Sequence, residues 1–314
     1  MISSPHHPPA RVRVAGAAVA AVGGVALAVQ GRINGQLGHV MHDGVFAALI
    51  SFGIGTVLLA VSVAATPSAR AGLVRLRNSV RGGRLRPWQC LGGACGALFV
   101  TAQGITVATL GVAVFTIAVV AGQVVASLAV DRAGLGPADP QPVTLPRAAG
   151  AALAVVAVVI AVSDHAAIEA GGLWWALLPA IAGLGLAWQA AVNGLVRVES
   201  DHIVVPTLVN FSVGTAALII AALVDALVRG LPGAPPGEFW YYVGGPLGMI
   251  AILTAVAAVR FTGVLLLGLA SVAGQLTGAV LLDIVVPTGG GLTAASVIGT
   301  AITMVAVGVA AIRR

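Results

Sequence analysis

The sequence predicts an all-α integral membrane protein with ten transmembrane helices, arranged as two inverted five-helix repeats. Three observations predict this fold. Hydrophobic residues make up 59% of the 314 residues and charged residues only 8%, whereas a soluble domain carries roughly a quarter charged residues. Apolar runs long enough to cross a bilayer recur along the whole chain. One polar motif is present in both halves of the chain.

The repeated motif begins with a Gln and an Asn four residues apart, which share one face of a helix. The first copy starts at Gln30 and Asn34 and the second at Gln189 and Asn193, so the offset is 159 positions (189 minus 30). Further matches are offset by 152 positions (240 minus 88). They join Trp88-x3-Gly92-Gly93 to Trp240-x3-Gly244-Gly245, and Gly122-Gln123 with Asp131 to Gly274-Gln275 with Asp283.

The apolar runs define the predicted spans, because a helix needs about 20 apolar residues to cross a bilayer. In chain order the spans are Val12–Leu37, Val45–Ala65, Trp88–Val107, Gly111–Val130, Pro146–Val162, Leu173–Val196, Val204–Leu227, Phe239–Val259, Thr262–Leu282 and Leu292–Ile312. Five fall in residues 1–165 and five in residues 166–314, so the second half enters the membrane in the opposite sense. Inverted repeats of this kind are a recurring transporter architecture.

The arginines orient the predicted spans. With the N-terminus inside, fourteen of the sixteen basic residues lie on the inner side, and only Arg32 and Arg229 lie outside. This bias predicts that both termini are cytoplasmic. Six of the arginines fall between residues 66 and 87, which we expect to form a cytoplasmic loop that anchors the topology; contact with anionic lipid headgroups is the alternative. Because the positive charge lies between apolar runs, we expect no nucleic-acid partner.

Neutral polar side chains inside the predicted spans form the candidate solute site: Gln30, Asn34, Gln189, Asn193, Gln123 and Gln275. Their duplication favours a shared cavity at the interface of the halves, although such amides also join membrane helices by hydrogen bonds. Ser51 and Asn210, at matched positions of the second and seventh spans, are candidates for additional hydrogen bonds. Trp188 is a candidate aromatic wall together with Phe52 and Phe211, suited to a hydrophobic cation; the alternative is packed or lipid-facing aromatics.

The acidic residues all fall at helix ends or in loops. Asp131 and Asp283 are duplicated and close their helices, at the inner and the outer face respectively. They are the candidates for proton coupling, although we favour solvated helix ends. The sequence shows no metal-ligand spacing and no nucleophile with a base, so we expect neither an enzyme nor a cofactor.

These motifs resemble the YdcZ-type family of bacterial inner-membrane proteins, within the drug/metabolite transporter superfamily. The shared features are Gln-x3-Asn, Phe-x2-Gly-Thr, Trp-x3-Gly-Gly, and Gly122-Gln123 followed by Ser127-Leu128-Ala129-Val130-Asp131. The resemblance implies a fused pair of five-helix units. The related small multidrug exporters carry a proton-coupling glutamate in the first helix, whereas this chain has Gln30 and Gln189, so that coupling is not carried over. The second half retains Asp283 but not the Ser-Leu portion.

Together these features predict a multi-pass transporter of the bacterial inner membrane that exports a small organic solute by alternating access between its halves. One alternative is a proton-coupled cation or multidrug antiporter that uses Asp131 or Asp283. Another is a membrane scaffold or lipid-handling protein, in which the amides only join helices. The expected partners are the solute and the lipid bilayer, and assembly into a homodimer is left open.

Overall fold

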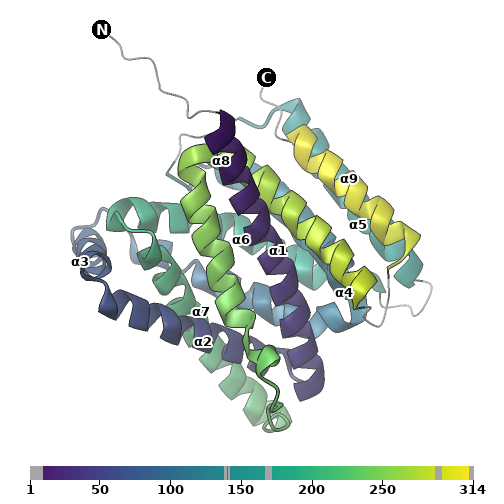
Figure 1. The fold of residues 1–314 in the computed structure, drawn as a ribbon, viewed down its shortest axis with the longest axis horizontal. Helices are drawn as coiled ribbons and strands as arrows, with labels where there is room; N and C mark the ends of the chain where they lie inside the picture. Colours follow the sequence, from purple (N-terminus) through teal and green to yellow (C-terminus); the bar gives the residue numbers. More distant parts are fainter. Residues whose placement is uncertain (1–9, 138–139, 141, 167–171, 287–291, 311–314) are drawn as a thin grey trace.

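The computed structural model describes residues 10–137, 140, 142–166, 172–286 and 292–310, and in them the regular secondary structure is helical (Figure 1). The predicted cytoplasmic ends of the chain lie outside these residues. In chain order the helices are α1 (Ala10–Met41), α2 (Gly44–Ala65), α3 (Pro67–Arg81), η1 (Pro87–Cys90), α4 (Gly93–Arg132), α5 (Leu145–Ala166), α6 (Gly172–Ser200), α7 (Val204–Arg229), η2 (Phe239–Tyr242), α8 (Gly244–Val285) and α9 (Ala294–Ala310).

Many of these helices have the length and apolarity of membrane spans, as the composition predicts. Among the described residues, five are long and apolar enough to cross a bilayer: Val14–Met41, Gly44–Ala65, Pro87–Arg132, Trp175–Ser200 and Val204–Arg229. Four shorter apolar helices accompany them. On α7, Ile220, Leu223 and Leu227 are 60–87% exposed, and such a large apolar surface is expected to face lipid rather than water. The helical membrane class is confirmed, and the count of ten spans stays a prediction.

Helix α4 contains both the third and the fourth predicted spans. Its 40 residues would form a rod about 60 Å long, twice the roughly 30 Å of bilayer hydrocarbon. The helix breaks at Gly111, where φ is 79° and ψ is 161°, a conformation that glycine adopts at low cost. We call the parts before and after this residue the first and second arms of α4.

Helix α8 likewise joins the eighth and ninth predicted spans in 42 residues. In Figure 1 it runs up along α1, reverses near its label and descends again. Its two arms enclose α1, because Gly23 faces Ala251 and Thr254 on the first arm while Gly24 faces Ser271 on the second. The most extensive helix contacts in the fold are those of α1 with α8 and of α6 with α4. A helix from each half therefore packs between the two arms of a long helix from the other half.

The Arg-rich segment is largely helical, so the prediction of a loop over residues 66–87 was wrong. Pro67 stands at the first position of α3, where its missing N–H is not needed. The buried face of α3 consists of Ala69, Gly72, Leu76 and Ser79, while most of its arginines are exposed. This amphipathic pattern turns a segment rich in charge into a helix packed on one side.

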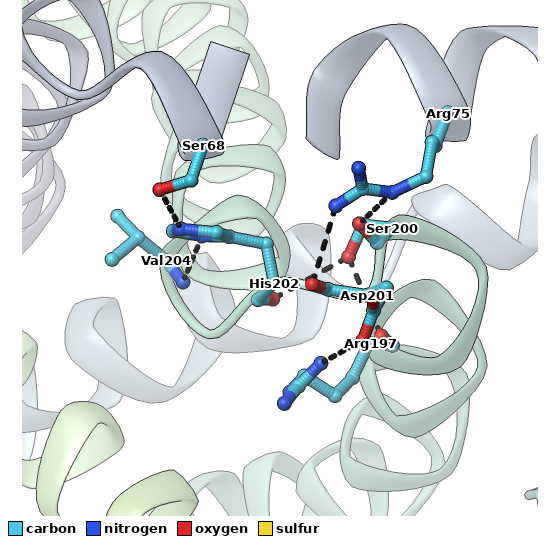
Figure 2. Close-up of polar contacts among 7 residues, drawn as sticks. All are labelled: Ser68, Arg75, Arg197, Ser200, Asp201, His202 and Val204. Atoms are coloured by element: carbon cyan, nitrogen blue, oxygen red, sulfur yellow. Dashed lines mark hydrogen bonds and ion pairs between the residues drawn. The ribbon is translucent and has the colours of Figure 1, made fainter. Parts of the chain in front are cut away.

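Helix α3 docks on the turn between α6 and α7 (Figure 2). Arg75 Nε donates to the Ser200 carbonyl at 3.0 Å, and the Arg75 guanidinium also reaches the Asp201 carbonyl at 3.3 Å. The hydroxyl of Ser79 donates to Glu199, which also pairs with Arg84. Because α3 precedes α4 whereas the turn joins α6 to α7, these bonds connect the two halves of the sequence.

Helices α2 and α7 meet at matched positions of the repeat. The rings of Phe52 and Phe211 stack with centroids 4.8 Å apart, and the hydroxyls of Thr56 and Thr215 lie 2.7 Å apart. The contact is reciprocal at the glycines too, since a methyl group added at Gly55 would overlap the Phe211 ring and one added at Gly214 would overlap the Phe52 ring.

Substitution at Gly55 tests this contact. Gly55→Ala places a methyl group into the Phe211 ring, so we expect a loss of about 1–3 kcal/mol of stability from overpacking. Gly53→Ala is the matched control on the same helix, because nothing lies within 4 Å of its added methyl group. Thermal unfolding of the detergent-purified variants measures both. Equal melting temperatures for the two variants would contradict the packing.

Candidate functional site

Four buried side chains from three helices form what we call the first amide cluster: Gln30 and Asn34 of α1, Ser51 of α2 and Gln103 of α4. Asn34 Nδ2 donates to Gln103 Oε1 at 2.8 Å. The sequence analysis missed Gln103, because the matched residue of the second half is Ala255 (103 plus 152). Its polarity within an apolar span was the available signal.

Two glycines of α8 lie directly against this cluster. A methyl group added at Gly244 would overlap Asn34 Oδ1 and lie 3.0 Å from Ser51 Oγ. One added at Gly248 would lie 2.6 Å from Gln30 Nε2. The glycines therefore let the first arm of α8 approach the amides closely, and the Gln-x3-Asn spacing on α1 meets a Gly-x3-Gly spacing on α8.

The second amide cluster repeats this arrangement with Gln189 and Asn193 of α6 and Asn210 of α7. A methyl group added at Gly92 would lie 3.0 Å from Asn193 Oδ1, and one added at Gly96 would lie 3.0 Å from Gln189 Oε1 and 3.3 Å from Asn210 Oδ1. The first arm of α4 thus lies on this cluster as α8 lies on the first. Nine residues were predicted for the solute site, apart from the coupling candidates Asp131 and Asp283. Seven of the nine lie in these two clusters or next to them: Gln30, Asn34, Ser51, Gln189, Asn193, Asn210 and Trp188.

Several polar atoms of the clusters are buried without a hydrogen-bond partner. In the first cluster they are the acceptor Asn34 Oδ1, the donor Gln103 Nε2 and the hydroxyl of Ser51. In the second they are the acceptor Gln189 Oε1 and the donor Asn210 Nδ2. A buried unsatisfied polar atom costs about 1–3 kcal/mol, so each cluster retains hydrogen-bonding capacity that the protein itself does not use.

The phenylalanine pair lies between the two clusters. Phe52 follows Ser51 of the first cluster along α2, and its ring reaches the Gly96 surface beside Gln189. Phe211 follows Asn210 of the second cluster and stacks on Phe52. Two stacked rings therefore lie between the two clusters.

The two remaining candidates, Gln123 and Gln275, lie elsewhere. Gln123 and Gln275 approach Gly183 and Gly24 through their backbone nitrogens, and no hydrogen bond in the described residues joins their side chains to either cluster. Trp188 does not join the phenylalanines in one wall, because it stacks on Trp88 with centroids 6.3 Å apart.

Trp88 also lines a cleft of about 440 Å³ at the end of the bundle where α3 lies. The lining residues are Gly83, Arg84, Arg86, Trp88, Gln89, Gly134, Leu135, Gly136 and Leu195. Trp188, which stacks on Trp88 of this cleft, directly precedes Gln189 of the second amide cluster in the chain.

Asp283 is buried, so the expectation of a solvated helix end was wrong for this residue. Its side chain is 2% exposed and accepts hydrogen bonds from the backbone N–H groups of Val112 at 3.1 Å and Ala113 at 2.8 Å. These are the first amides after the break at Gly111, so Asp283 caps the second arm of α4. Its matched partner Asp131 is 44% exposed and pairs with Arg147.

Arg32, which the charge distribution placed at the outer side, is 6% exposed inside the bundle. It interacts electrostatically with Asp283. The pairing joins α1 of the first half to the end of α8 in the second, and a buried charge without such an opposite charge is strongly disfavoured.

A second acidic contact lies at the turn between α1 and α2, outside the apolar spans. Asp43 Oδ1 accepts from the N–H groups of Val45 and Phe46 at 2.9 Å each and so caps α2. Burial raises the pKa of Asp43 above its ordinary value, the α2 amides oppose this shift, and the neighbouring Asp225 carboxyl raises the pKa further. In the described residues, no three His, Cys, Asp or Glu side chains lie close enough to share a metal ion.

Comparison with known families agrees with this architecture. The family model described as "Putative inner membrane exporter, YdcZ" matches residues 15–160 and, a second time, residues 174–310. No curated protein matches the chain. The two matched segments contain the first and the second copy of the Gln-x3-Asn motif, respectively.

The cap on α4 is tested by Asp283→Ala. The variant leaves two buried amide donors and the Arg32 charge without their carboxylate, so we expect a loss of about 3 kcal/mol or more of stability. Asp131→Ala is the matched control, because it removes a half-exposed ion pair worth about 1 kcal/mol or less. Thermal unfolding distinguishes them, and an equal effect of both substitutions would refute the cap.

The raised pKa of the Asp43 carboxyl predicts that the stability of the protein depends on pH. Because its pKa is raised in the folded protein, its stabilising contribution is complete below the ordinary aspartate pKa of about 3.9 and is lost as the pH rises through the folded-state value. Asp43→Asn keeps an acceptor for the α2 cap but carries no titrating group at this position. The melting temperature of the variant, measured relative to that of the wild type, should therefore increase as the pH rises above about 4. Asp201→Asn, at an exposed carboxylate, is the control. Parallel melting profiles of wild type and Asp43→Asn would contradict the prediction.

Proposed function

Because the chain belongs to the YdcZ-type family of inner-membrane exporters, we propose that it exports a small organic solute by alternating access between its two halves. The description of the family as inner membrane exporters supports a transporter rather than an enzyme. The class of solute, its binding site and the transport mechanism are proposed from the structure. Its central support is the set of buried, unpartnered polar atoms that the two amide clusters present where the halves meet.

The proposed architecture has ten spans in two inverted halves, residues 1–165 and 166–314, with both termini in the cytoplasm. The breaks in α4 and α8 supply the two additional crossings of the bilayer. Reciprocal contacts between Phe52 and Phe211 and between Thr56 and Thr215 support a twofold relation, because matched residues touch one another only near such an axis. The axis would lie in the membrane plane, as in other transporters with inverted repeats.

The solute would bind the two clusters in turn. The twofold relation puts the clusters on opposite sides of the stacked phenylalanines, so the rings act as a barrier between an inner and an outer half-site. The cleft beside Arg84 and Arg86 would be the cytoplasmic entrance, because positive charge marks the inner side of a membrane protein. The tryptophan pair would separate this entrance from the second cluster.

A purely structural role, in which the amides only join helices, explains some polar groups of the clusters and not others. Asn34 and Gln103 do join α1 to α4 by a hydrogen bond. Within the part of the chain that the structure describes, the hydroxyl of Ser51 and the Nδ2 group of Asn210 form no hydrogen bond, so these atoms do not hold helices together. This distinction favours a solute site over a scaffold.

Proton coupling through Asp283 is not part of the proposal. The carboxylate accepts two backbone hydrogen bonds and interacts with Arg32, which are the contacts of a structural anion. A proton carrier must instead exchange its proton with water or with solute during each cycle.

Transport is tested with proteoliposomes loaded with a total small-molecule extract of bacterial cytosol. We expect at least one solute to leave vesicles that contain the protein faster than it leaves empty vesicles, as measured by mass spectrometry. Ser51→Ala should reduce this release about tenfold, since one hydrogen bond to a solute is worth about 1.4 kcal/mol. The same substitution should leave the melting temperature unchanged or higher, because it removes an unsatisfied buried hydroxyl.

Ser62→Ala is the matched control for this experiment. Ser62 also lies on α2, but it is exposed and bonds the Leu58 carbonyl within its own helix. Its loss should affect neither release nor melting. Identical release from vesicles with and without the protein would remove the proposed function.

A further inference from the structure

The unpartnered atoms of the amide clusters define what the solute must offer. Each cluster presents a free amide carbonyl, Asn34 Oδ1 or Gln189 Oε1, and a free amide NH₂ group, Gln103 Nε2 or Asn210 Nδ2. The complement of a carbonyl is a donor and the complement of an NH₂ group is an acceptor. A hydroxyl or a carboxamide supplies both functions within one group.

The charges around the clusters do not suit a cation. None of the acidic side chains that the structure describes belongs to a cluster: Asp283 caps α4, Asp131 pairs with Arg147, Glu199 binds α3, Asp201 pairs with Arg197, Asp225 pairs with Arg229, Asp43 caps α2 and Glu238 is exposed. The charged residue of α1 that lies between Gln30 and Asn34 in the chain is Arg32, which is buried and positive. A cation desolvated in this environment would lack a counter-charge, which is strongly unfavourable.

The aromatic side chains do not replace a counter-charge. A cation–π contact requires an open ring face. Phe52 and Phe211 stack on each other at 4.8 Å, and Trp88 and Trp188 stack nearly parallel, with 16° between their planes. One face of each ring is thus covered by its partner, and the edges of the phenylalanines are packed against Gly55, Gly96 and Gly214. In the described residues, Trp188 stacks on Trp88 and not on the phenylalanines, so the three rings do not line up as the aromatic wall that was considered for a hydrophobic cation.

We propose that the two amide clusters bind an uncharged solute whose hydroxyl or carboxamide groups both donate and accept hydrogen bonds, and that they reject organic cations. This inference rests on the proposed function and specifies its substrate class. It also explains why each cluster keeps an amide donor and an amide acceptor without a partner among the described residues. The first cluster would bind more tightly, because the bond from Asn34 fixes the orientation of Gln103, which has no counterpart in the second half.

Matched probes test the charge rule on the full-length protein in proteoliposomes. Nicotinamide and 1-methylnicotinamide carry the same carboxamide and differ by one methyl group and one positive charge. Ribitol and tetraphenylphosphonium extend the comparison to a neutral polyol and a hydrophobic cation. We expect nicotinamide or ribitol to cross at least about tenfold faster than either cation, and we expect Ser51→Ala and Asn210→Ala each to lower that flux about tenfold, while Ser62→Ala leaves it unchanged.

Two results would overturn the inference. One is flux of either cation that equals or exceeds that of both neutral probes and falls in Ser51→Ala. The other is release of only charged solutes from the vesicles loaded with cytosolic extract. Both results leave the export function standing, because they demonstrate transport. Failure of every extract solute and every probe to cross would instead end the proposed function together with the inference.

Discussion

Direct contact between helix backbones at glycines is the interaction on which the rest of the structure depends. Gly24 lies against the Ser271 carbonyl and Gly183 against the Val119 carbonyl, so α1 and α6 each touch the second arm of a long helix without an intervening side chain. Gly93 and Gly245 do the same against Asn210 and Ser51. Lipid supplies no hydrophobic force between helices, and close packing replaces it. The same proximity places the amide side chains of one half beside the glycines of the other.

The repeats in the sequence predicted part of the arrangement, although the duplicated Gln123 and Gln275 lie outside both clusters. The duplicated Gln-x3-Asn motif predicted which side chains would lie together, and both copies form clusters with the predicted Ser51 and Asn210. Gln103 has no copy, so duplication provided no signal for it. The Arg-rich segment was assigned to a loop because its charge outweighs its apolar residues, although Ala69, Gly72 and Leu76 follow a helical period. The burial of Asp283 depends on a backbone break at Gly111, far away in the chain, and local patterns do not report such a partner.

The two halves share a plan but differ in chemistry. The first amide cluster contains an internal hydrogen bond and lies on the same helix as a buried arginine, whereas the second has neither Gln103 nor Arg32 at its matched positions. Asp283 is a buried cap while Asp131 forms a half-exposed ion pair. Under the proposed function, this asymmetry would give a solute unequal affinities for the two clusters, and binding differences of this kind bias which conformation is populated.

The cap on α4 also has a consequence for how the chain is made. Ala113 and the carboxylate that accepts its N–H group are separated by 170 residues. Ribosomes add about 5–20 residues per second, so roughly 10–30 s pass between synthesis of the broken helix and arrival of its cap. During that interval the new helix end has amides that lipid cannot solvate. The final form of this break in α4 is therefore reached only after the second half of the chain has been made.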